Sequence, residues 1–129
     1  MRLIAPIAAA ALALALAGGP AAAHPGVRGR SASAAGSRLQ VTQLEYRLVL
    51  SRGVVAAGPV SLETIDGGMD PHDLRLRRGA SGPALAQAAL TPGQRSDVVV
   101  DLRPGVYHLW CSLPGHWKLG MRATLRVVR

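Results

Sequence analysis

The sequence is short of the residues on which small stable domains often depend. Its 129 residues include one cysteine, Cys111, so the chain cannot form an internal disulfide bond. It has no phenylalanine, two tyrosines and two tryptophans. So few aromatic rings disfavour a nucleic-acid surface built from stacked bases. The length alone favours one small domain over a multidomain enzyme.

Long hydrophobic runs are also absent, apart from one at the N-terminus. Arg2 precedes an apolar run over residues 3–17, and small residues ending in Ala21, Ala22 and Ala23 follow it. This order is typical of a secretory signal peptide, whereas a membrane-spanning helix needs roughly 20 apolar residues. We predict a signal peptide over residues 1–23 and an extracytoplasmic protein, periplasmic or secreted. Retention of this segment as a membrane anchor is the alternative.

Acidic side chains are scarce as well. Seven Asp and Glu residues stand against 15 Lys and Arg residues, which gives a formal net charge of +8. The arginines are spread along the chain, and a spread positive charge favours attraction to an acidic partner or an anionic surface. We expect a partner with an acidic surface, with peripheral membrane contact as a further alternative. Nucleic acid is not expected as a partner.

What the chain does contain is a repeated alternation of apolar and polar residues after Arg38. A period of two indicates strands with one buried face. Such strands are expected near 39–50 (with a kink near 42), 60–63, 74–78, 98–102, 106–111 and 121–127. Gly- and Pro-rich turns separate them, and six or seven short strands predict an all-β sandwich or a small barrel. The Ala-rich residues 83–90 are expected to be helical or irregular.

Three potential metal ligands follow one another at five-residue intervals near the C-terminus. Cys111, His116 and Met121 lie between two expected strands, with turn-forming Gly and Pro residues among them. His72, just before the expected strand at Leu74, is the natural fourth ligand. Two histidines and a cysteine with a weak axial methionine form a ligand set that suits one-electron copper chemistry.

Each of these residues also has an ordinary structural explanation. A lone strand cysteine is usually a small buried hydrophobe, Met121 shares the parity of core residues, and His72 could cap a turn. Their order and spacing together favour copper ligation. A structural zinc site is the chemical alternative, and the methionine argues against it.

This pattern resembles the cupredoxins, the blue (type 1) copper proteins. The similarity is strongest over residues 104–116 (PGVYHLWCSLPGH) and the following Gly120-Met121, and it extends over roughly 38–129. It implies a Greek-key β-sandwich of about seven strands that holds one copper ion, Cu(I) or Cu(II), and transfers electrons. By this resemblance His72, Cys111 and His116 are the equatorial ligands, and Met121 is the long axial ligand. The gap from Cys111 to His116 resembles azurin and auracyanin, and the gap from His116 to Met121 resembles plastocyanin.

One position departs from the family pattern. Many cupredoxins have Asn directly after the first ligand His, and this chain has Asp73 there. An ionised acid can accept hydrogen bonds from the Ser112 hydroxyl or from nearby backbone N–H groups, but it cannot donate one. We therefore expect Asp73 and Ser112 to support the ligands, with a consequence for the reduction potential.

The resemblance implies a carrier of single electrons between redox partners, and the predicted signal peptide implies that this carrier is exported. Leu113, Pro114, Trp117 and Leu119 would form an apolar contact patch around His116, of a size suited to brief docking. The alternative is an extracytoplasmic copper-binding or copper-delivery protein without an electron-transfer role.

Further features bear on the domain organisation and on rival functions. We expect a flexible N-terminal segment over 24–37, a copper-binding domain over 38–129 and a monomer. We expect no enzyme activity, because a copper enzyme needs further metal centres and only two other histidines remain. His108 has the opposite strand parity to Cys111 and should point away from the site. His24, in the flexible segment, is expected to have an incidental role.

Overall fold

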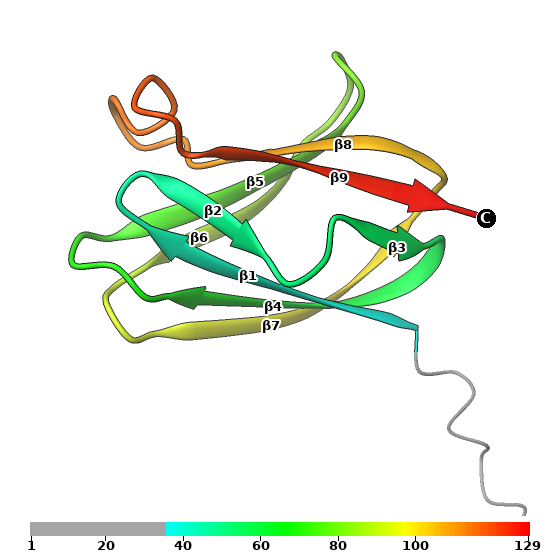
Figure 1. The fold of residues 1–129 in the computed structure, drawn as a ribbon, viewed down its shortest axis with the longest axis horizontal. Helices are drawn as coiled ribbons and strands as arrows, with labels where there is room; N and C mark the ends of the chain where they lie inside the picture. Colours follow the sequence, from blue (N-terminus) through cyan, green and yellow to red (C-terminus); the bar gives the residue numbers. More distant parts are fainter. Residues whose placement is uncertain (1–35) are drawn as a thin grey trace, which may run out of the picture.

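Residues 36–129 form a sandwich of two β-sheets in the computed structural model, which describes only these residues (Figure 1). The predicted signal peptide, nearly all of the predicted flexible segment and His24 lie outside the described residues. None of the described residues forms a helix with the length and apolarity that a membrane crossing requires.

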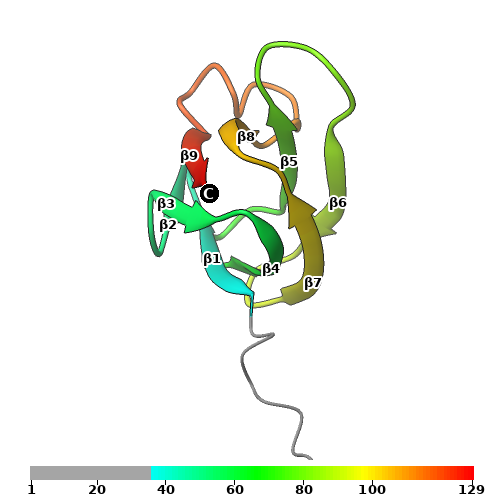
Figure 2. The ribbon, with the colours of Figure 1, turned by 90° about the vertical axis from the view of Figure 1, so that its right-hand side faces the viewer.

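The two sheets contain nine strands in the described part of the chain. These are β1 (Ser37–Leu44), β2 (Arg47–Leu50), β3 (Val54–Ala56), β4 (Gly58–Asp66), β5 (His72–Arg78), β6 (Leu85–Leu90), β7 (Arg95–Leu102), β8 (Gly105–Trp110) and β9 (Arg122–Val128). One sheet has the order β2-β1-β4-β7 and the other β3-β9-β8-β5-β6. The pairs β1–β4 and β3–β9 are parallel, so both sheets are mixed. The end-on view shows the two sheets facing each other (Figure 2).

The core lies between the sheets because alternate residues of each strand face inward. In β1, Leu39, Val41 and Gln43 are buried while their neighbours are partly or fully exposed. In β8, Tyr107 and Leu109 are buried in the same way. The prediction of an all-β sandwich is therefore confirmed.

The Ala-rich segment over 83–90 was predicted to be helical or irregular, and this prediction is wrong. Leu85–Leu90 form β6, which pairs with β5 at the edge of its sheet. Only Gln87 of this strand is buried. An edge strand that buries one polar side chain leaves no apolar alternation in the sequence, and pairing with β5 overrides the helical preference of alanine.

The N-terminal strand prediction needs a second correction. The chain turns at Glu45 and Tyr46, so the expected strand near 39–50 is a hairpin, in which Val41 pairs with Leu50. The short β3 was not expected either, because its three residues are too few to show a period.

Three segments that are distant in sequence meet at one end of the sandwich. They are the β1–β2 turn, the β4–β5 loop and the long β8–β9 loop, drawn at the left of Figure 1. The C-terminus lies at the opposite end. The candidate ligands lie on or beside these segments.

Candidate metal centre

Three potential donor atoms converge at this end of the sandwich. The Nδ1 atoms of His72 and His116 are 3.2 Å apart, and the Sγ atom of Cys111 lies 3.5 Å from His116 Nδ1. One donor atom from each of the three residues lies within 4.8 Å of the other two. His72 and Cys111 are wholly buried, while His116 is partly exposed. The structure thus brings together three of the residues predicted as ligands.

The β8–β9 loop folds back so that its two ends are adjacent. The His116 N–H donates to the Leu113 carbonyl over 3.2 Å. Gly115 and Gly120 have φ values of 83° and 109°, which favour glycine because they lie in the left-handed region. The loop therefore presents the His116 ring to Cys111, the first residue after β8.

Met121 closes this loop at its base. Its backbone N–H donates to the His116 carbonyl over 3.0 Å, and its carbonyl accepts from the Cys111 N–H over 3.1 Å. The Met121 side chain is completely buried and belongs to the apolar core. The predicted axial ligand is thus bound through its backbone to both of the other ligands from the loop.

Glu45 is a residue of the site that the sequence analysis missed. Its Oε1 atom lies 3.2 Å from His72 Nε2, on the side of the ring away from His116. The same oxygen accepts hydrogen bonds from the Met69 and Asp70 N–H groups over 2.6 and 2.8 Å. Glu45 therefore connects the β1–β2 turn with the loop before β5. With Nε2–H donated to this carboxylate, Nδ1 of His72 keeps its lone pair for a metal.

The surroundings of Glu45 keep it ionised. Hydrogen bonds from the Asp70 and Met69 backbone, in that order of effect, lower the pKa of Glu45 to about 2. A Cβ at Gly68 would overlap the carboxylate, so only glycine fits there without displacing it. No spacing motif marks Glu45, because it lies 27 positions before His72.

Asp73 connects the two ligand-bearing segments. Its Oδ1 accepts the Ser112 N–H over 2.6 Å, and its Oδ2 accepts the Ser112 hydroxyl over 2.5 Å. Arg75 donates to the same carboxylate, with Nε and Nη2 each 3.1 Å from Oδ2. Asp73 directly follows His72 in the chain, and Ser112 directly follows Cys111. Their contacts therefore fix the β5 strand against the residue that follows Cys111.

The pKa values of the Asp73 carboxyl and the Cys111 thiol are shifted in opposite directions. Burial alone would raise the pKa of Asp73, but the hydrogen bonds from Ser112, together with those from Cys111 and Arg75, lower it overall. Burial raises the pKa of the Cys111 thiol, and the nearby Asp73 charge adds to this. Cys111 is therefore a thiol until a metal displaces its proton.

Tyr46 is a second residue that the sequence analysis did not place in the site. Its ring packs edge-to-face against the His116 ring with 5.1 Å between centroids. The His72 and His116 rings have the same centroid separation. His116 is thus held between an aromatic ring and the second imidazole, which restricts its rotation.

The donor set fits a single metal ion of the copper or zinc type. Bonds from such an ion to imidazole nitrogen and thiolate sulfur are about 2.0 to 2.3 Å long, so donors at the observed separations can share one ion. Two imidazoles and one thiolate favour copper over zinc when a methionine, here the buried Met121 whose backbone contacts Cys111 and His116, is the candidate fourth ligand. His72, Cys111 and His116 would hold the ion, with Met121 as the candidate axial ligand.

The predicted contact patch is largely exposed around His116. Pro114, Trp117 and Leu119 are exposed, Trp117 by 51% and Leu119 by 60%, while Leu113 is half-buried. His108 is exposed on the outer face of β8 and lies apart from the three donors.

Comparison with known proteins finds likeness in solved structures alone. No protein-family model and no curated protein matches the sequence. Dithionite-reduced auracyanin from Roseiflexus castenholzii is 16% identical, with a TM-score of 0.60 over 74% of this chain and 99% of that one. Auracyanin A from Chloroflexus aurantiacus, described as a "blue" copper protein, is 16% identical, with a TM-score of 0.57 over 72% and 99%. Rusticyanin from Thiobacillus ferrooxidans is 13% identical, with a TM-score of 0.56 over 72% and 79%. The TM-scores show that this chain shares its fold with these proteins.

Proposed function

Because this chain has the cupredoxin fold, we propose that it is a small blue copper protein that carries single electrons between redox partners. The observation that carries this proposal is the convergence of His72 Nδ1, His116 Nδ1 and Cys111 Sγ at one end of the sandwich. Copper bound by these residues and Met121 would supply one-electron exchange between Cu(I) and Cu(II).

The rigidity of the site favours an electron carrier over a copper-delivery protein. Glu45 and Asp73 fix the residues on either side of the metal position, and Tyr46 packs on His116. A ligand set that keeps its geometry changes little between oxidation states, so electron exchange needs little reorganisation. A delivery protein instead has to open its site to release the ion.

Voltammetry with a competing chelator distinguishes the two functions. We expect the purified copper protein to give a reversible one-electron wave with fast self-exchange, and to lose Cu(I) slowly to a chelator such as bicinchoninate. Sluggish electron exchange together with rapid transfer of Cu(I) to the chelator would support delivery and contradict the carrier proposal.

Replacing Glu45 by glutamine should raise the reduction potential. The negative carboxylate beside His72 stabilises the more positively charged Cu(II) state, and glutamine keeps the shape without the charge. We expect a rise of up to about 59 mV, which is a tenfold change in the relative stability of the two oxidation states for a one-electron couple. Redox titration followed by visible absorption measures it.

Glu63→Gln is the matched control for this variant. Glu63 lies on β4 and pairs with Arg95 over 3.2 Å, outside the group of metal donors. This substitution removes the same charge, so its effect on the potential should be much smaller. Equal shifts in the two variants would mean that net charge, and not the contact with His72, sets the change.

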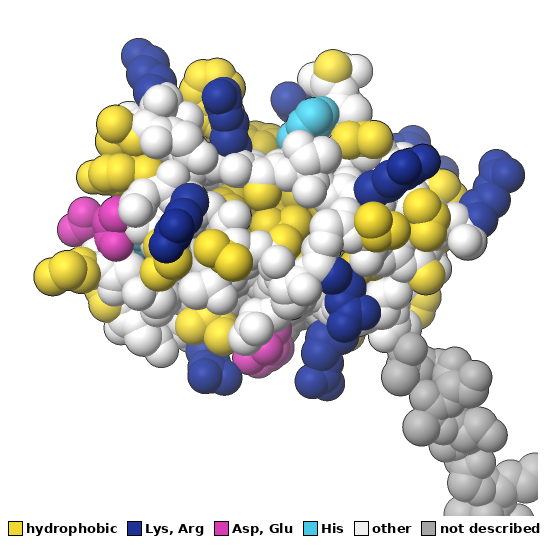
Figure 3. Space-filling view, in the orientation of Figure 1, with side chains coloured by type: hydrophobic (Ala, Val, Ile, Leu, Met, Phe, Trp, Pro, Cys, Tyr) yellow, Lys and Arg dark blue, Asp and Glu magenta, His cyan; other side chains and the backbone are white. Residues whose placement is uncertain are grey.

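The remaining parts of the proposal rest on the sequence. The N-terminal pattern of residues 1–23 supports export to an extracytoplasmic compartment, and the excess of Arg supports a partner with an acidic surface. Arg and Lys side chains are spread over the face shown in Figure 3, which suits long-range attraction. A monomer without enzyme activity remains our prediction.

A further inference from the structure

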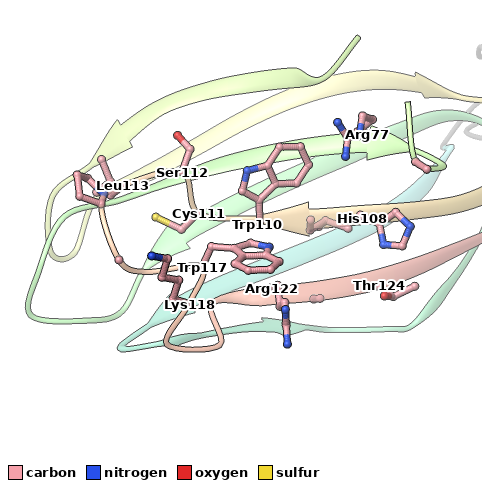
Figure 4. A pocket seen from close by; sticks show the side chains of 15 residues that line it. Arg77, His108, Trp110, Cys111, Ser112, Leu113, Trp117, Lys118, Arg122 and Thr124 are labelled. Atoms are coloured by element: carbon pink, nitrogen blue, oxygen red, sulfur yellow. The ribbon is translucent and has the colours of Figure 1, made fainter. Parts of the chain in front are cut away.

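A groove of about 910 Å³ lies beside the β8–β9 loop, on the outer face of the β5-β8-β9 part of its sheet (Figure 4). The alternation of these strands places His108 and Trp110 of β8 on this outer face. On β9, Arg122 lies opposite Trp110 and Thr124 lies opposite His108. The loop residues that border the groove include Trp117. The groove is therefore built from outward-facing side chains of the sheet together with residues of the β8–β9 loop.

The groove is positively charged. Arg77, Lys118 and Arg122 line it, and no acidic residue of the described chain does. The ion pairs that the described residues form with arginine involve Arg75 and Arg95 instead. Three cations without neutralising carboxylates attract negative charge to this face.

Two of the cations are held in place by the two tryptophans. The Arg77 guanidinium carbon lies 5.3 Å from the centre of the Trp110 ring, and that of Arg122 lies 4.7 Å from the centre of the Trp117 ring. Such cation–π contacts restrict long flexible side chains. Binding a partner therefore costs less entropy in these two arginine side chains than it would if they were free.

We propose that this groove, defined by Arg77, Trp110, Trp117, Lys118 and Arg122, is the surface on which an acidic face of a redox partner protein docks. The inference rests on the proposed function, because it names the partner surface of the same copper site. The groove adjoins the apolar patch around His116 and continues it across the outer face of β8 and β9. Docking here places the partner over Trp110, the residue directly before Cys111.

The two tryptophans provide a direct assay. The chain contains only Trp110 and Trp117, and both line the groove, so every indole signal reports on it. Hexaglutamate serves as the probe, added to the metal-free protein at low salt. We expect the indole N–H resonances and the tryptophan fluorescence to shift saturably, and the affinity to fall as salt screens the charges.

Paired charge reversals separate the groove from net charge. Lys118→Glu with Arg122→Glu should weaken hexaglutamate binding by about tenfold or more, since both cations face the probe. Arg103→Glu with Arg126→Glu makes the same change in net charge on exposed residues outside the groove. This control should weaken binding by less than about threefold. All four side chains are exposed, and thermal unfolding verifies that both variants fold.

Several results would overturn the proposal. One is that hexaglutamate leaves both indoles unchanged, and another is that the two double variants weaken binding equally. If phosphatidylglycerol vesicles shift the indole signals and hexaglutamate does not, the surface faces a membrane and the proposal is wrong. Blue colour on adding Cu(II) to the same samples tests the proposed function separately, because the peptide assay contains no metal.

Discussion

Replacing Cys111 by serine should abolish the intense visible absorption of the copper-loaded protein. The Cys111 thiolate is the only donor at the site whose bond to Cu(II) absorbs visible light strongly. A serine hydroxyl does not ionise to take its place. Cys111 is completely buried at the end of β8, and serine has nearly the same shape, so the sandwich should stay folded. Absorption and electron-spin-resonance spectra after addition of one equivalent of Cu(II) measure the effect.

His108→Gln is the control for this experiment. His108 lies on β8, the strand that leads directly into Cys111. Its side chain faces outward, and it belongs to no group of metal donors in the described residues. Its substitution should leave the blue spectrum intact. A protein that keeps its colour in the Cys111→Ser variant, or loses it in His108→Gln, would contradict the assignment of the ligands.

Replacing Asp73 by alanine should lower the free energy of unfolding by about 2 kcal/mol, which lies within the range for hydrogen bonds to a charged group. The ion pair with Arg75 adds little to this, because the Arg75 side chain is 35% exposed and solvent screens the pair. The loss arises because the Ser112 N–H and hydroxyl lose their common acceptor. Urea unfolding of the metal-free protein, followed by circular dichroism, measures the change.

A more conservative variant and a surface control define this effect. Asp73→Asn keeps an acceptor for Ser112 and should cost only about 1 kcal/mol. Asp97→Ala, on the exposed face of β7, should stay within about 0.5 kcal/mol of the parent. If Asp73→Ala is no less stable than Asp97→Ala, the Asp73 contacts do not fix the site.

The contribution of Asp73 to stability should also depend on pH in a defined direction. The pKa of Asp73 is lowered in the folded protein, so its contribution is complete above the ordinary value of about 3.9. As pH falls through the lowered folded pKa, the proton neutralises the carboxylate and the contribution disappears. The difference between the parent and Asp73→Ala should therefore shrink in strong acid.

The sequence predicted best those parts of the site that lie close together in the chain. Cys111, His116 and Met121 occupy one loop, so their spacing alone indicates that they can converge. His72 was found because it starts a strand with a clear apolar alternation. Glu45 was missed because its position depends on a turn inside an apparently continuous pattern.

The fold shows the same limit. Strands with a buried face, such as β8, follow from alternation, because the core selects every second residue. The edge strand β6 buries only Gln87, so its sequence carries no such record. Pairing between strands, which decides such a segment, is a long-range property that composition does not show.

The central claim is that one copper ion binds among His72, Cys111 and His116, and diffraction at the copper absorption edge tests it most directly. Crystals of the copper-loaded protein should give one strong anomalous peak, at bonding distance from the Nδ1 atoms of both histidines and from the Cys111 sulfur. An anomalous peak elsewhere, for example at His24 or His108, without a peak among these three residues would contradict the account.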